Sequence, residues 1–593
     1  MKYSYCSTTP PVFLSGKWNE TIPKEFQMRT NLNLLLVCMF AGSFVAFAQP
    51  SVESRPFLFT RADTLRGMLT PERKCYDVKY YHLDVKIDPD KKFISGSNTI
   101  AFSVDSACNR MQVDLFRNME IQKITLDRDL AVTFERDSNA VFVKLPQVIE
   151  KNSRHELKIF YSGNPTVAKM PPWDGGFTWA HDSSGHPWVV VTCQGTGASL
   201  WWPNKDHQSD KPDSMLISIT VPNGLLDISN GRLRSVVPLA DGWTRYDWYI
   251  SYPINNYCVT VNVGKYAHFD DIYVNGDTLT LDYYVLPENV EKAKVHFRDV
   301  KSMLTAFEKY FGKYPFIHDG YKLVECPHTG MEHQSAVAYG NRYLKGYRGR
   351  ASSEVGLNFD FIIIHESAHE WWGNNVTSKD IADMWIHESF GAYAEALYVE
   401  HLYGHMQSLA YINAKKQNVR NSEPIIGVYN VQHEGSGDMY DKGQLVLNTF
   451  RSVLDNDSLW FSILRGIQET FRYQTITADD VVQFVNKKTG KDYTYFFNQY
   501  LKFSKIPQLQ IMVWKKGKQV TARYRWNADV HDFRMPIKIT TSENTYEFIY
   551  PTTSWQTATL GSIRPEDVRV AEDLFYVGVK LNYGYLDPQL HDN

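Results

Sequence analysis

The sequence predicts a multidomain α+β protein with three folded parts. Short segments that alternate apolar and polar residues, such as His82–Ile87, recur between turn residues over 73–268, which is typical of an antiparallel β domain. Over 269–503 the spacing of apolar residues becomes helical, which predicts a mainly helical domain. Alternation returns after Pro507 and predicts a C-terminal β-sandwich over 504–593. A chain of 593 residues is also too long for one hydrophobic core.

Residues 1–48 are interpreted as an export signal with a misassigned N-terminal extension. A mostly apolar stretch from Leu32 to Ala48 follows Arg29, and it ends in the small-x-small pattern that signal peptidase cleaves. The residues before Met28 are polar, which is not typical of such a signal, so Met28 is the better candidate start.

The mature protein is therefore expected to begin at Gln49 and to be exported, either periplasmic or secreted. The alternative is an uncleaved membrane anchor, although the apolar stretch is shorter than the roughly 20 residues that span a bilayer. We expect no stable membrane insertion after cleavage. Residues 49–72 are predicted to be a linker.

The net charge and the cysteine positions limit which partners and cross-links the sequence favours. The formal net charge of −3 does not favour nucleic acid or an anionic membrane surface as a partner. Five cysteines remain after the signal, and their scattered positions predict neither a disulfide framework nor a cysteine-based metal site. One disulfide is left open, and the oligomeric state does not follow from the sequence.

A metal-binding pattern lies in the predicted helical domain. His365 and His369 are four residues apart, so on a helix they lie on one face and can hold one metal ion, with Glu366 between them. Glu388 lies near the start of a second predicted helix, Met384–His401. Two nitrogens and one oxygen are a zinc ligand set that leaves a fourth position open for water. The pattern predicts a zinc hydrolase with one Zn²⁺ per chain.

The chain resembles the aminopeptidase N family of zinc metallopeptidases, which includes the leukotriene hydrolase branch. The family's metal helix reads His-Glu-x-x-His, then eighteen residues, then Glu, and it continues through Trp-x-Gly-Asn and Val-Thr. The matching residues of this chain are His365, Glu366, His369, Trp371, Gly373, Asn374, Val376, Thr377 and Glu388.

Three further segments carry the resemblance. Tyr76-Asp77-Val78 is similar to the family's opening strands, Gln194 with Trp201-Trp202-Pro203 to its substrate-binding strand, and Tyr440-Asp441-Lys442-Gly443 to its catalytic-tyrosine segment. The resemblance implies a thermolysin-like catalytic domain, with Tyr440 as the donor that stabilises the oxyanion. It places Gln194 beside the amino end of the substrate.

The family's exopeptidase signature, Gly-x-Met-Glu-Asn, corresponds to Thr329-Gly330-Met331-Glu332-His333. Thr329 and His333 depart from it, whereas Gly330 and Met331 remain as substrate-binding candidates. The resemblance makes Glu332 the carboxylate that binds the free amino group of the substrate. A carboxylate at a fixed distance from the metal meets the chemical need for holding an ammonium group one residue from the scissile carbonyl.

These observations predict a zinc aminopeptidase that acts on peptides, with Glu366 as general base. The alternatives are a zinc endopeptidase or epoxide hydrolase of the same fold, and a non-catalytic peptide-binding module. Many family members continue into a large helical domain. This chain ends about 90 residues after the catalytic region, which leaves no room for one, and it is expected to be an exported bacterial-type member without that domain.

Overall fold

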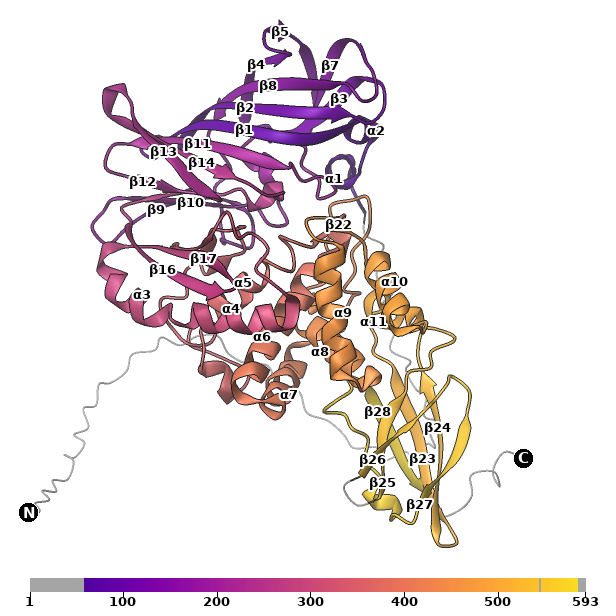
Figure 1. The fold of residues 1–593 in the computed structure, drawn as a ribbon. Coiled ribbons are helices and arrows are strands. Elements are labelled where there is room, and N and C mark those ends of the chain that lie inside the picture. Colours follow the sequence, from indigo (N-terminus) through magenta and orange to yellow (C-terminus); the bar gives the residue numbers. More distant parts are fainter. Residues whose placement is uncertain (1–57, 543–544, 585–593) are drawn as a thin grey trace, which may run out of the picture. The chain divides into compact units, whose positions relative to one another are not determined.

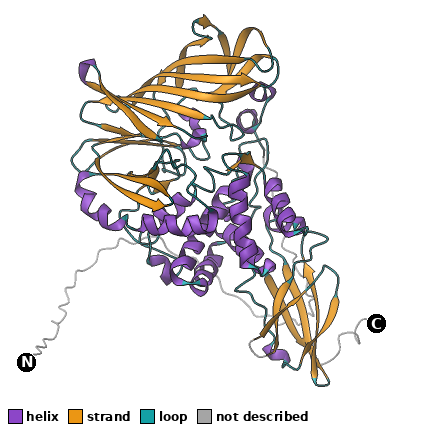
Figure 2. Ribbon diagram, viewed as in Figure 1, coloured by secondary structure: helices purple, strands orange, loops and turns teal. Residues whose placement is uncertain are grey.

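The structure, a computed structural model, describes residues 58–542 and 545–584 (Figures 1 and 2). The predicted signal and extension at 1–48 lie outside the described residues. From Phe59 onward, the described chain belongs to one compact unit. No helix in the described ranges combines the length and the apolar character needed to cross a bilayer.

An eight-stranded sheet dominates the N-terminal region, at the top of Figure 1. Leu83, Val85 and Ile87 of the predicted alternating segment are buried on one face of β1, as that pattern requires. The sheet is antiparallel except between β1 and β11, which run parallel. In sheet order its strands are β13 (Arg232–Pro238), β14 (Trp243–Ile250), β11 (Ser214–Pro222), β1 (Tyr76–Asp88), β2 (Phe93–Val104), β8 (Arg154–Gly163), β4 (Met119–Leu126) and β5 (Leu130–Ala131).

Two smaller sheets complete this region. One contains β12 (Leu226–Ile228), β15 (Asn262–Gly264), β10 (Pro187–Thr192) and β9 (Gly176–His181). The other contains β3 (Cys108–Asp114), β7 (Ala140–Ile149) and β6 (Thr133–Asp137). Gln194 lies two residues after the end of β10.

Two short helices lie at the segment predicted as a linker (49–72): α1 (Arg61–Gly67) lies inside it, and α2 (Pro71–Lys74) crosses its end. Thr60 and Asp63 form a capping box at α1, and proline occupies the first position of α2. Arg73 of α2 is fully buried and pairs with Asp114 at 2.7 Å. These contacts tie the segment to the β region.

The region that follows combines a five-stranded sheet with most of the helices. The strands in sheet order are β16 (Ala267–Asn275), β17 (Asp277–Val285), β18 (Tyr321–Glu325), β20 (Val337–Tyr339) and β19 (Gly330–Met331). The helices are α3 (Val290–His296), α4 (Asp299–Phe311), α5 (Phe361–Ala368), α6 (Trp385–Tyr403), α7 (His405–Ala414), α8 (Asp438–Leu454), α9 (Asp457–Thr470), α10 (Ala478–Thr489) and α11 (Thr494–Lys502). A short pair, β21 (Thr377–Ser378) and β22 (Thr475–Ile476), links two of its loops.

The C-terminal region is again made of strands, at the lower right of Figure 1. A four-stranded sheet contains β27 (Gln556–Gly561), β24 (Gln519–Asn527), β23 (Gln508–Lys516) and β28 (Gly578–Gly584), and a hairpin contains β25 (Ile537–Ser542) and β26 (Thr545–Ile549). Alternate residues of β23 and β25, such as Ile511 and Ile539, are buried in a shared core. The five cysteines of the described chain are free thiols.

Candidate metal centre and active site

The metal pattern lies on two helices that approach each other closely. Asp360 caps the N-terminus of α5 by accepting hydrogen bonds from the backbone of Ile362 and Ile363, and His369 follows the last turn of this helix. Glu388 lies in the first turn of α6. A Cβ atom at Gly391 of α6 would lie 2.9 Å from Cε1 of His369, so glycine is what allows this approach.

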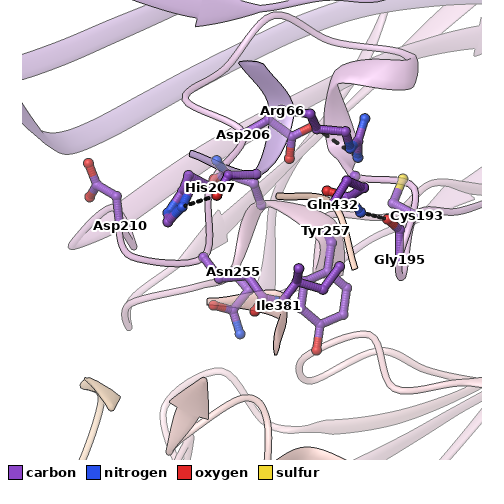
Figure 3. Close-up of a pocket in the computed structure, with 14 residues that line it drawn as sticks. Arg66, Cys193, Gly195, Asp206, His207, Asp210, Asn255, Tyr257, Ile381 and Gln432 are labelled. Atoms are coloured by element: carbon purple, nitrogen blue, oxygen red, sulfur yellow. Dashed lines mark hydrogen bonds and ion pairs between the residues drawn. The ribbon is translucent and has the colours of Figure 1, made fainter. Parts of the chain in front are cut away.

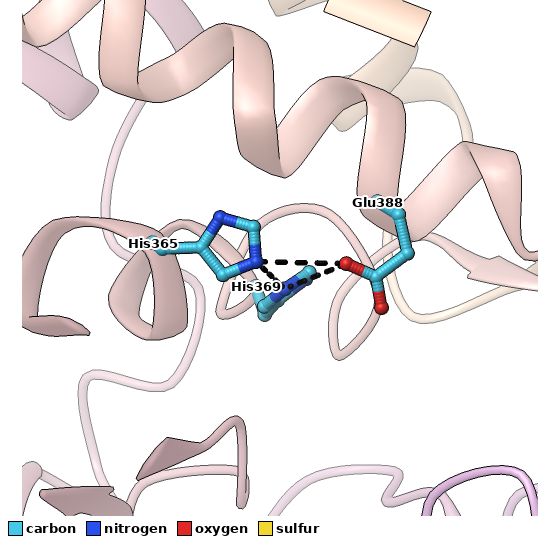
Figure 4. A group of neighbouring side chains, drawn as sticks. All are labelled: His365, His369 and Glu388. Carbon is cyan, nitrogen blue, oxygen red and sulfur yellow. Dashed lines mark hydrogen bonds and ion pairs between the residues drawn. The ribbon is translucent and has the colours of Figure 1, made fainter. Parts of the chain in front are cut away.

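His365, His369 and Glu388 converge on one point (Figure 4). Their Nε2, Nε2 and Oε2 atoms are separated by 3.4 Å between the histidines, 3.6 Å from His365 to Glu388 and 3.5 Å from His369 to Glu388. All three side chains are buried. The structure therefore brings together the three ligands predicted from the sequence.

The outer hydrogen bonds set the tautomers of both histidines. Nδ1 of His365 donates to Oε1 of Glu395 at 2.7 Å, and Nδ1 of His369 donates to the carbonyl oxygen of Trp372 at 2.9 Å. Each Nε2 atom therefore presents a lone pair to the shared point. Oε2 of Glu388 is buried there and has no hydrogen-bond partner among the described residues. These two Nε2 atoms and the Oε2 atom are three acceptors that point at one position with no donor among them, an arrangement that suits a bound cation.

The separations agree with zinc. Ligand atoms held about 2.0–2.1 Å from a tetrahedral zinc ion are about 3.3 Å apart, close to the separations of these three atoms. Two imidazoles also favour zinc over calcium, which takes only oxygen ligands. The residues present thus fit one zinc ion with an open fourth position.

Gln194 connects the metal centre to the predicted amine-binding residue. Its Nε2 atom donates to Oε1 of Glu332 and to Oε1 of Glu388, each at 2.7 Å. Glu332 follows β19 and is 2% exposed. Burial raises the pKa of Glu332, a shift that the nearby His369 opposes. The side-chain amide of Gln194 therefore holds the carboxylate of Glu332 beside Glu388 of the metal centre.

Glu366 and the β19 strand face each other across a narrow gap. A Cβ atom at Gly330 would lie 2.7 Å from Oε1 of Glu366 and 2.7 Å from Cγ2 of Ile362. Only glycine lets this strand lie so close to α5. Burial raises the pKa of Glu366 to about 7, with the histidines opposing and the neighbouring carboxylates adding to the shift.

Tyr440 lies in the first turn of α8, with its ring 6.0 Å from that of His365. Its hydroxyl has no hydrogen-bond partner within the described chain, and burial raises its pKa well above the usual value, so it remains a donor. Gly443 allows the approach of α8 to α6, since a Cβ atom there would lie 2.0 Å from Oγ of Ser389. Lys442 anchors the helix by donating to the carbonyl oxygen of Ser504 at 2.8 Å.

These residues line one cavity of about 290 Å³. Pro172 and Trp173 contribute a loop from the β region, and the Trp173 ring is 66% exposed at the rim. Every predicted site residue lines this cavity, namely Gln194, Gly330, Met331, Glu332, His365, Glu366, His369, Glu388 and Tyr440.

A small polar pocket of about 50 Å³ lies beside the Gln194 turn and is lined by Cys193 and Gly195 (Figure 3). Within it the side chain of Gln432 donates to the carbonyl oxygen of Gly195. Gln432 precedes α8, so this bond joins the turn that carries Gln194 to the segment that leads to Tyr440.

Sequence reasoning missed two residues that support the site, Glu395 and Glu370, and assigned no role to a third, Asn374, which it had matched to the family pattern. Glu395 orients His365; it lies seven residues after Glu388, on the same face of α6, and this spacing is the signal that identifies it. Glu370 accepts from the backbone of Ser335 at 2.9 Å and so holds the loop after Glu332. Asn374 donates to the carbonyl oxygen of Glu332 itself at 2.9 Å.

Comparison with protein families identifies the chain. The model described as "Peptidase M1 N-terminal domain" matches residues 77–258, and the one described as "Peptidase family M1 domain" matches residues 295–500. The chain belongs to peptidase family M1. This confirms the resemblance to the aminopeptidase N family, and the second M1 model includes both metal helices.

Curated M1 relatives are distant and longer. Endoplasmic reticulum aminopeptidase 1 of Mus musculus is 23% identical over 298 residues, which are 48% of this chain and 32% of that protein. Glutamyl aminopeptidase of Homo sapiens is 28% identical over 221 residues, which are 36% of this chain and 22% of that protein. The match therefore spans about a third of these relatives or less.

Solved M1 structures share the fold. A two-domain M1 zinc metallopeptidase bound to L-tryptophan superposes with a TM-score of 0.63 at 19% identity, over 73% of this chain and 96% of that one. An M1 zinc metallopeptidase from Deinococcus radiodurans gives 0.60 at 18% identity, over 73% and 94%. The predicted combination of an N-terminal β region and a helical catalytic region is confirmed.

Proposed function

We propose that this M1 protein is a zinc-dependent aminopeptidase that hydrolyses the first peptide bond of peptides with a free amino terminus. The observation that carries the proposal is the position of Glu332, held by Gln194 next to the ligand Glu388. A buried carboxylate in this place attracts the ammonium group of a substrate, and it limits how far the amino end of that substrate extends past the metal.

His365, His369 and Glu388 would hold the zinc ion. When bound, zinc supplies a Lewis acid that polarises a carbonyl group and lowers the pKa of a water molecule. Glu366 lines the same cavity and takes the proton from the attacking water as general base. It then returns a proton to the leaving amine, so the same side chain serves both halves of the reaction.

Tyr440 stabilises the negative charge that develops on the carbonyl oxygen. Its hydroxyl is protonated and has no competing partner among the described residues, so it is free to donate to that oxygen. A donor of this kind commonly contributes about 3 kcal/mol to lowering the barrier.

Glu332 recognises the free amino terminus of the substrate. Its carboxylate and the amide oxygen of Gln194 are acceptors near the metal centre, and an α-ammonium group supplies the donors. An N-acetylated peptide has no charge there and leaves the carboxylate without its partner. Discrimination against blocked peptides is therefore the property that defines the proposed activity.

The test is a comparison of an aminoacyl chromogenic substrate with its N-acetylated form, with zinc content measured on the same protein. Cleavage of the free form alone supports the proposal. Equal cleavage of both forms indicates a zinc endopeptidase, and opening of an alkyl epoxide without peptide cleavage indicates the epoxide hydrolase alternative. Zinc binding without any turnover indicates a peptide-binding module.

We also propose that the protein is exported after cleavage before Gln49, on the basis of the apolar stretch and its small-x-small end. Mass spectrometry of the protein from extracytoplasmic fractions should give a chain that begins at Gln49. A chain that retains residues 32–48 in the membrane fraction contradicts this location.

A further inference from the structure

A second cavity, of about 790 Å³, adjoins the active-site cavity. The two share Tyr347 and Phe361 in their linings and no other residue. We call the second one the basic cavity, because its charged lining residues are Arg342, Arg348, Arg350, Lys415 and Asp441.

The positive charge of the basic cavity is only partly compensated. Lys415 lies 3.7 Å from Asp441 and 3.8 Å from Glu395, so its charge is balanced. Arg342, Arg348 and Arg350 form no ion pair with any carboxylate in the described ranges. Guanidinium groups bind carboxylates through two parallel hydrogen bonds. The cavity is therefore suited to an anionic group that the chain itself does not supply.

The loop that carries these arginines is held in one conformation. Asn341 is fully buried, accepts from the backbone of Arg348 at 2.8 Å and donates to Asp360 at 2.8 Å. Arg342 and Arg348 have φ values of 56° and 53°, a conformation that persists only where surrounding contacts enforce it. Because Asp360 also caps the metal helix, the position of the loop is coupled to that of the metal ligands.

The basic cavity lies within reach of a bound peptide. The Phe361 ring stacks on His365 with centroids 5.2 Å apart, and Nζ of Lys415, which lines the basic cavity, lies 5.4 Å from the centroid of the same ring. An extended peptide advances about 3.3–3.6 Å per residue. Three residues beyond the scissile bond therefore span about 10 Å, which is comparable to the two distances that lead from His365 over Phe361 to Lys415 of the basic cavity.

The two cavities attract opposite charges. Glu332 and Gln194 line only the active-site cavity, where the amino end of a peptide is proposed to bind. The surplus of arginines lines only the basic cavity. A short peptide has an ammonium group at one end and a carboxylate at the other, which matches this arrangement.

We propose that the basic cavity binds a carboxylate in the part of the peptide beyond the scissile bond. This inference rests on the proposed aminopeptidase function. It adds a preference for substrates that carry a carboxylate in the leaving part of the peptide. Two sources have the required chemistry: the terminal carboxylate of a tri- or tetrapeptide, and an acidic side chain at the corresponding position of a longer peptide.

The test measures kcat/KM by mass spectrometry of the released first residue. One arm compares a tripeptide with its C-terminal amide, and a second compares C-terminally amidated pentapeptides with Glu or Gln at positions three and four. An aminoacyl-coumarin, which ends before the basic cavity, serves as the reference substrate. We expect the carboxylate-bearing member of at least one pair to be preferred about tenfold, and the arm that responds identifies the source.

The double variant Arg348→Gln/Arg350→Gln should abolish most of that preference while aminoacyl-coumarin turnover stays unchanged. The backbone bond from residue 348 to Asn341 does not depend on the side chain. Arg154→Gln is the matched control, because Arg154 is an exposed arginine on β8 in the N-terminal region. It should behave like the wild type on every substrate.

The outcomes separate the two proposals. Aminoacyl-coumarin cleavage without a preference for a carboxylate in either arm overturns the inference alone, as does a preference that the double variant retains in full. Failure of the wild-type zinc protein to cleave any free aminoacyl or peptide substrate overturns the proposed function, and the inference with it.

Discussion

Nδ1 of His365 donates a 2.7 Å hydrogen bond to Oε1 of Glu395, a carboxylate that is 1% exposed and also accepts from the hydroxyl of Tyr411. This bond directs the Nε2 lone pair of His365 toward the shared point of the three ligands. Carboxylates in this position raise the basicity of a ligating histidine and fix its ring.

Glu395→Gln should therefore weaken zinc binding about 10- to 100-fold, because the amide removes the charge behind His365. Competition with a chelator of known affinity measures the change. Tyr411→Phe is the control, since it removes one hydrogen bond to Glu395 and leaves the carboxylate in place. Equal zinc affinity of wild type and Glu395→Gln would show that the bond does not tune the metal centre.

Glu366→Gln should retain zinc and lose turnover by about 10²- to 10⁴-fold, because the amide cannot accept the proton from water. His365→Ala should lose the zinc itself, since a ligand is removed. Metal analysis and kcat on the same samples distinguish the two effects. Full activity of metal-free wild type contradicts both expectations.

Tyr440→Phe should lower kcat by about 10²- to 10³-fold with little change in KM. The lost hydroxyl acts on charge that develops only in the transition state. Thermal unfolding should be unaffected, because the hydroxyl has no hydrogen-bond partner among the described residues. A rise in KM alone would instead assign Tyr440 to ground-state binding.

Gly330→Ala should reduce both activity and stability. The added methyl group meets Oε1 of Glu366 and Cγ2 of Ile362 at 2.7 Å, so β19 or α5 must move, at a cost of about 1–3 kcal/mol. Gly437→Ala is the matched control, since its φ is −61° and no atom lies within 4 Å of the new Cβ. Comparable kcat/KM and unfolding midpoints for the two variants would refute the close approach.

His333 should make the protein less stable in acid. Burial lowers its pKa to about 3, whereas a histidine in the unfolded chain has a pKa near 6.5. The unfolded state therefore binds more protons between these values, and the free energy of unfolding falls as the pH decreases below about 6.5.

The variant His333→Asn, which restores the residue of the family signature, should lose less of its unfolding free energy between pH 7 and pH 5.5, by about 1.3 kcal/mol. Denaturant unfolding at the two pH values measures this difference, and zinc release in acid affects both proteins alike. Identical pH dependence of the two proteins would exclude a buried neutral His333.

Much of the helical region follows from local sequence. The apolar residues 361–364 immediately before His365 are typical of a buried helix, and they form the start of α5. The predicted helix Met384–His401 corresponds closely to α6 (Trp385–Tyr403). The spacing of apolar residues over 290–311 predicts one helical segment, whereas the structure has two helices, α3 and α4. The break between them buries Phe297 against Tyr283 and Tyr339. Such a break depends on packing partners that helical periodicity does not contain.

The sequence predicted the zinc ligands from the spacing of His365 and His369 together with Glu388 on a second predicted helix, because helix geometry places residues four apart on one face. The contact between Gln194 and Glu332, the support from Glu395 and the basic cavity beside Phe361 were decided only by the tertiary structure. These residues are distant along the chain or lie on different elements, and only the packing of the helices against the strands brings them together.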